Sequence, residues 1–98
     1  MHQTIVVGAI KMKMINRETI LETLVEVDSP TAFPAGNVVA GLDIITDVVG
    51  AARFSKEDGF YKTVAVDTML AYNFSKKDCV YLQALGWFIE SEYLVIRI

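Results

Sequence analysis

The chain has a single cysteine, Cys79, and a single histidine, His2, among its 98 residues. One cysteine cannot form an intrachain disulfide or supply a cysteine-based metal site within one chain. A catalytic thiol needs a basic partner, and we expect His2, close to a terminus, to lie in a frayed segment. We therefore interpret Cys79 as a small apolar packing residue and expect neither a cofactor nor a metal. A reducing compartment fits this cysteine usage, and we place the protein in the cytoplasm.

Positive charge is also scarce, since nine Lys and Arg stand against twelve Asp and Glu, a net charge of −3. The largest basic groups are two residues each, Lys11 with Lys13 and Lys76 with Lys77. Proteins that bind nucleic acid or anionic lipid carry larger basic patches. The longest stretch without a charged residue, 29–42, is shorter than the ~20 apolar residues of a membrane helix. We expect no leader and no membrane partner, and the charge balance disfavours a nucleic-acid partner.

Apolar residues, by contrast, make up 53% of the chain, which is the balance of a folded protein rather than a disordered one. The length predicts a single globular domain over residues 1–98. A domain of this size buries only about two-thirds of its unfolded surface. Apolar surface left outside favours a homodimer. The candidate interface is Tyr93, Leu94, Val95 and Ile96, because this run is apolar on both faces of its strand.

In the first half of the chain, alternation and β-branched residues predict a strand over 4–14. An N-capping asparagine and apolar residues at helical spacing predict a helix over 17–27. The two prolines predict a loop over 28–37. Residues 38–52 fit either a helical stripe or strands, and their β-branched residues and glycines favour a strand over 37–45.

The second half contains two predicted hairpins with a helix between them. Asp58-Gly59 is a residue pair typical of tight hairpin turns and predicts a hairpin over 51–66, with its second strand extending toward Phe74. Ser75 and Asp78 form a capping-box pattern that begins a helix over 76–85, and Gly86 ends it. Residues 87–98 form the second hairpin. Together these elements predict an α+β domain with an antiparallel sheet and two helices on one face, near the ferredoxin-like split βαβ arrangement.

The sequence has no phosphate-binding glycine loop and no serine-triad pattern. Asp67 lies inside an apolar run, where it either ends a strand or occupies a functional position. Late aromatics such as Tyr81 and Trp87 either fill the core or wall a pocket. A small-ligand pocket near the 28–37 loop, in a binding domain or a small enzyme, would use Phe33, Asp67, Tyr81 and Trp87.

The helix over 76–85 and the hairpin after it resemble the second half of a winged-helix DNA-binding unit. The resemblance covers about the last quarter of the chain and implies DNA contact led by Lys76 and Lys77. Val80 and Tyr81 leave little polar surface on that helix for reading bases. We therefore rank three functions. A non-catalytic interaction module acting as a homo-oligomer comes first, a small-ligand domain or enzyme second, and a winged-helix DNA binder third.

Overall fold

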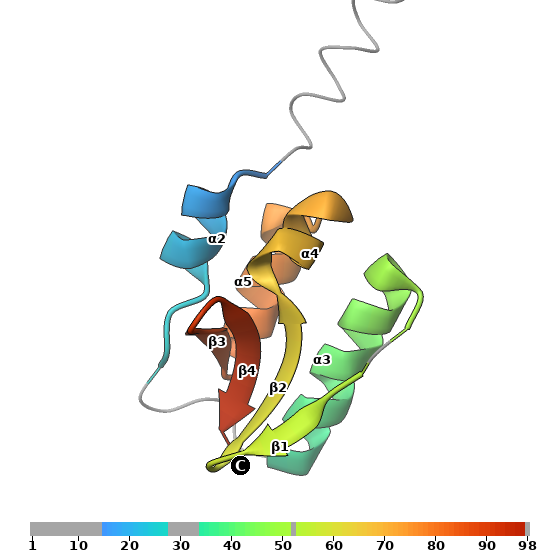
Figure 1. The fold of residues 1–98 in the computed structure, drawn as a ribbon, viewed down its shortest axis with the longest axis vertical. Coiled ribbons are helices and arrows are strands. Elements are labelled where there is room, and N and C mark those ends of the chain that lie inside the picture. Colours follow the sequence, from blue (N-terminus) through green and yellow to red (C-terminus); the bar gives the residue numbers. More distant parts are fainter. Residues whose placement is uncertain (1–14, 28–33, 52, 98) are drawn as a thin grey trace, which may run out of the picture.

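The fold is an antiparallel sheet with helices packed on one of its faces (Figure 1). The computed structural model describes residues 15–27, 34–51 and 53–97. Its elements are, in chain order, α2 (Arg17–Thr23), α3 (Pro34–Val49), β1 (Ser55–Glu57), β2 (Phe60–Ala65), α4 (Val66–Ala71), α5 (Lys76–Ala84), β3 (Trp87–Glu90) and β4 (Tyr93–Arg97). The strand order is β1-β2-β4-β3, and each neighbouring pair is antiparallel. The predicted α+β class with an antiparallel sheet is confirmed.

The helix number and the finer topology differ from the prediction. The described residues contain four helices rather than two. Because β2 and β3 are both antiparallel to β4, they run parallel to each other, and α4 with α5 connects them around β4. That is one split βαβ unit. The full ferredoxin-like arrangement is not confirmed, because β1 forms a hairpin with β2 and follows α2 and α3.

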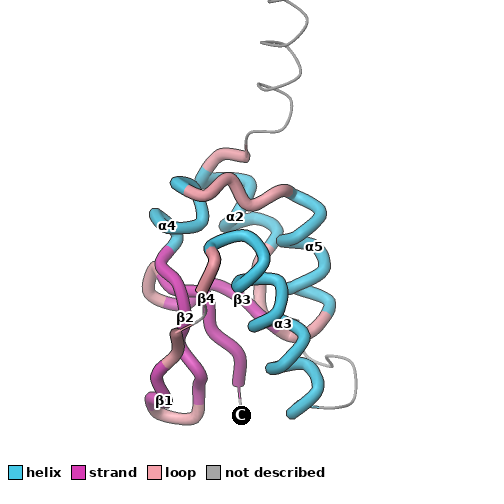
Figure 2. The backbone as a smooth tube through the Cα atoms, turned by 90° about the vertical axis from the view of Figure 1, so that its right-hand side faces the viewer, coloured by secondary structure: helices cyan, strands magenta, loops and turns pink. Residues whose placement is uncertain are grey.

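The core lies between the sheet and the helices. Figure 2 shows the arrangement of these two layers from the side. Its members share almost complete burial and come from every described helix, from β3 and β4, and from the segments directly after α2 and α4: Ile20, Leu24, Ile45, Val66, Met69, Phe74, Cys79, Leu82, Trp87, Leu94 and Ile96. Leu94 and Ile96 alternate with Val95, so the side chain of Val95 belongs to the opposite, open face of the sheet.

Helix α3 corrects the prediction of a strand over 37–45. Trp87 Nε1 donates a hydrogen bond to the Asn37 carbonyl oxygen at 3.1 Å, and the indole lies directly over Gly41. Ile45, one turn further on, is fully buried. Tertiary packing of one helical face thus outweighs the strand preference of the β-branched residues.

Several other boundaries shift or lie outside the described residues. The predicted loop over 28–37 is wrong for its last four residues, which begin α3, and residues 28–33 are outside the described part. The predicted strand over 4–14 is also outside it. The predicted helix over 17–27 is confirmed at its start, where the Asn16 side chain accepts from the Thr19 backbone N–H at 2.8 Å. It ends at Thr23.

The local signals in the second half of the chain are mostly confirmed. Asp58 and Gly59 both have positive φ in the first hairpin turn, and Gly86 has a φ of 99° after α5. The capping box of Ser75 and Asp78 is complete. The predicted extension of the strand toward Phe74 is wrong, because α4 begins directly after β2. None of the described helices has the length and apolar character needed to cross a bilayer.

Candidate functional site

The predicted pocket residues are not gathered around one hollow. Trp87 is fully buried in the core, whereas Tyr81 is exposed on α5. Asp67 lies in the first turn of α4 rather than at a strand end, and its exposed carboxylate is 3.1 Å from Arg17 Nη1. Phe33 lies outside the described residues.

The predicted interface residues lie in the central strand β4, which is paired with β2 on one side and β3 on the other. The exposed fractions of Leu94, Val95 and Ile96 are 0, 3 and 4%. These three side chains are therefore taken up by packing within one chain, and of the four predicted residues Tyr93 alone remains exposed.

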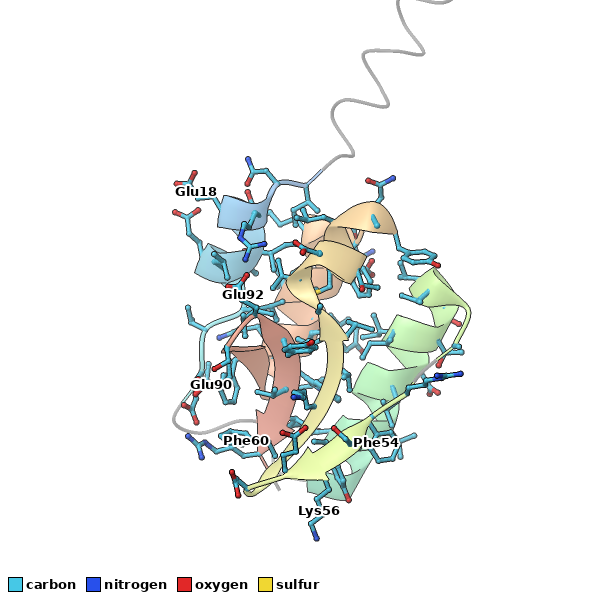
Figure 3. The ribbon with its side chains drawn as sticks, in the orientation of Figure 1. Glu18, Phe54, Lys56, Phe60, Glu90 and Glu92 are labelled. Atoms are coloured by element: carbon cyan, nitrogen blue, oxygen red, sulfur yellow. The ribbon has the colours of Figure 1, made fainter. Side chains whose placement is uncertain are left out.

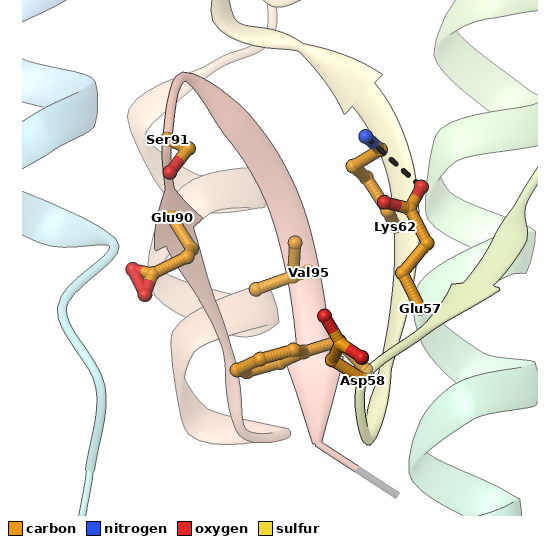
Figure 4. Close-up of a pocket in the computed structure, with 7 residues that line it drawn as sticks. Glu57, Asp58, Lys62, Glu90, Ser91 and Val95 are labelled. Atoms are coloured by element: carbon orange, nitrogen blue, oxygen red, sulfur yellow. Dashed lines mark ion pairs between the residues drawn. The ribbon is translucent and has the colours of Figure 1, made fainter.

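A shallow hollow of about 210 Å³ lies on the open face of the sheet (Figure 4). Phe60 and Val95 contribute its apolar surface, and the other lining residues are polar or charged: Glu57, Asp58, Lys62, Glu90 and Ser91. Lys62 Nζ lies 3.0 Å from a Glu57 carboxylate oxygen, and its hydrogen bond, aided by one from Ser55, lowers the pKa of Glu57. Pockets that enclose small ligands usually measure about 300–1,000 Å³. The hollow is smaller than that.

Beside the hollow, Arg97 covers part of the open face. The Arg97 guanidinium lies over the rings of Phe60 and Phe88, 4.8 and 5.8 Å from their centroids. Arg97 also forms an ion pair with Glu26, and this hydrogen bond lowers the pKa of the Glu26 carboxyl. Within the described residues, no group of three or more His, Cys, Asp or Glu could hold a metal ion.

Helix α5 presents an exposed face that we call the α5 stripe, made of Lys76, Lys77, Val80, Tyr81 and Ala84. Their spacing places all five on one side of the helix. The opposite side packs in the core through Cys79 and Leu82. Val80 and Tyr81 are 49 and 58% exposed. A valine and a tyrosine therefore lie next to each other at the surface, one helical turn after the two lysines. The sequence singled out Tyr81 for a pocket and missed this surface, although helical spacing places Tyr81 away from the core residues Cys79 and Leu82.

Cys79 is buried, as its interpretation as a packing residue requires. Burial, together with the negative charge of Asp78, raises the pKa of its thiol to about 11. At pH 8 the thiolate fraction is therefore about a hundredfold smaller than in an exposed thiol. We expect a disulfide reagent such as DTNB to label the folded protein at least a hundredfold more slowly than protein unfolded in guanidinium. Equal rates in the two states would contradict this burial.

The order of elements adds a second observation about α5. From α3 onward, the chain forms helix, hairpin strands, helix, turn, helix and a final hairpin, and β2 lies beside β4. In this order α5 is the second helix of a helix-turn-helix pair and directly precedes the final hairpin. Comparison with family models, curated proteins and solved structures gives no match for the chain.

Proposed function

We propose that the protein is a non-catalytic interaction module that acts as a homo-oligomer in the cytoplasm. The observation that carries this proposal is the α5 stripe, where Val80 and Tyr81 remain half-exposed while Cys79 and Leu82 on the same helix are buried. Tyrosine is enriched at the energetic centres of protein interfaces because it combines a large apolar ring with a polar tip. The single cysteine, protected in the core, is compatible with a reducing compartment.

A second candidate function is DNA binding through α5, favoured by the winged-helix-like connectivity and by Lys76 and Lys77 in the first turn of that helix. The turn of the final hairpin argues against it. In a winged-helix unit this turn approaches the phosphates, and here it carries the exposed carboxylates Glu90 and Glu92. The small-ligand function has less support, because the sheet hollow includes none of its candidate residues.

Sedimentation at micromolar concentration tests the proposal with matched variants. We expect an oligomer that Tyr81→Ser weakens at least tenfold, because the tyrosine is a central apolar contact. The control is Val39→Ser, which changes an equally exposed residue on α3 and should leave association unchanged. A monomer at all accessible concentrations would overturn the proposal.

A parallel titration of labelled duplex DNA at about 150 mM salt tests the second candidate. We expect no sub-micromolar binding, since phosphate neutralisation by lysines supplies most non-specific affinity and only two are present on α5. Tight binding that is lost in Lys76→Gln/Lys77→Gln would make DNA the partner of α5 instead.

A further inference from the structure

A second exposed stripe lies on α2 and just beyond it, made of Glu18, Leu21, Glu22 and Val25, which we call the α2 stripe. The positions follow i, i+3, i+4 and i+7, so those within the helix share one side. Leu21 and Val25 are 38 and 50% exposed. Ile20 and Leu24 face the core instead. The α2 stripe therefore combines apolar side chains with negative charge, whereas the α5 stripe combines them with positive charge.

The two stripes lie on helices that pack against each other, and both helices begin at the same end of the domain (Figures 1 and 2). In Figure 3, Glu18 points from α2 away from the body of the protein. Among the described residues, Glu18 and Glu22 on α2 and Lys76 and Lys77 on α5 form no ion pair within the chain. All four charges are free to meet a partner.

From this complementarity we infer that the partner is a second copy of this chain, with the α2 stripe of each copy on the α5 stripe of the other. The inference rests on the proposed function and names its surface. The two-fold axis of this dimer lies at the interface between the copies and runs parallel to α2 and α5. Rotation about it places α2 of each copy against α5 of the other, which gives two identical contacts in one closed interface. Rotation about this axis does not shift either copy along the helices. The glutamates of α2 in one copy therefore lie beside the lysines at the start of α5 in the other.

The alternative symmetric contact, α5 on α5, is disfavoured by charge. With the two-fold axis parallel to the helices, it would bring Lys76 and Lys77 of both copies together, and like charges placed across an interface oppose association. The reciprocal contact instead pairs opposite charges around the apolar residues Leu21, Val25, Val80 and Tyr81. Charge thereby fixes which helix meets which, and the apolar residues contribute most of the affinity.

Paired charge reversals test this arrangement directly. Variant A is Glu18→Lys/Glu22→Lys, and variant B is Lys76→Glu/Lys77→Glu. Each variant alone places like charges at both contacts of its homodimer, so we expect self-association weakened at least tenfold. In an equimolar mixture, lysines on α2 of A meet glutamates on α5 of B, and lysines on α5 of A meet glutamates on α2 of B. We expect the mixture to form an A–B dimer near parental affinity.

Sedimentation of A, B and their mixture, with circular dichroism to verify folding, decides between the outcomes. The chain carrying all four reversals is a second check, since it should form a homodimer again. If the parent is monomeric, the proposed function itself fails. If the parent is dimeric but A and B associate like the parent, or if their mixture gives no heterodimer, the reciprocal interface is overturned while self-association stands.

Discussion

Gly41→Ala is expected to destabilise the protein by about 3 kcal/mol, the upper range for overpacking a core. A Cβ at residue 41 would lie 2.1 Å from Trp87 Nε1, 2.3 Å from Cε2 and 2.6 Å from Cζ2. The indole is rigid and fully buried, so it cannot move aside as the end of a flexible chain would. Moving it would also break its hydrogen bond to the Asn37 carbonyl. Replacing glycine by alanine at an exposed helical site has the opposite sign, a gain of roughly 0.5–1 kcal/mol.

Urea unfolding measures the effect, and the same helix offers a control. Gly36 is exposed near the start of α3, so Gly36→Ala should be neutral or slightly stabilising. The penalty of Gly41→Ala should shrink in a Trp87→Leu background, because the smaller side chain leaves room for the new methyl group. A Gly41→Ala protein as stable as the parent would show that α3 does not pack against the indole.

Leu94→Gln is expected to cost about 3–4 kcal/mol, whereas Val95→Gln, one residue further on, should cost about 1 kcal/mol. Both side chains are buried in the same central strand. Leu94 faces the helices inside the apolar core, where an amide would find no hydrogen-bond partner. Val95 faces the open side of the sheet and lines the hollow beside Lys62 and Ser91. An amide there can reach water and polar neighbours.

The two glutamine variants are controls for each other, since they share the strand, the substitution and nearly the same exposure. Chemical denaturation at equilibrium gives both free energies of unfolding. Equal losses would mean that the outer face of the sheet is as enclosed as the core, and the assignment of an open face would then be wrong.

The features that could be predicted from the sequence depend on residues close together in the chain. The Asn16 cap, the Asp58-Gly59 turn and the Ser75–Asp78 capping box each involve at most four consecutive residues, and all are present. Helix α3 could not be predicted this way. Its helical state depends on Trp87, 50 residues beyond the Asn37 carbonyl that the indole binds. Local preference for strand was the stronger signal within 38–52.

The candidate interaction surface likewise depends partly on local sequence and partly on contacts between distant residues. Apolar composition alone does not tell which aromatic residue is buried, because Tyr81 and Trp87 look equally suited to a core. Packing of Cys79 and Leu82 in the core leaves Tyr81 outside, and the following strand places Trp87 inside. The run Tyr93 to Ile96 was predicted to be an interface because it is apolar on both faces of its strand. Its pairing with β2, 28 to 35 positions earlier in the chain, has no local signal.

The position of β4 has a consequence for synthesis on the ribosome. This strand joins β2 to β3, yet it follows every other described element in the chain. Until it emerges from the exit tunnel, the nascent chain has helices whose inner apolar faces lack the sheet centre against which they pack. Partly made chains with such exposed apolar surface are prone to aggregate and are typical clients of chaperones. Folding of this domain is therefore expected to be completed only after the final hairpin has left the exit tunnel.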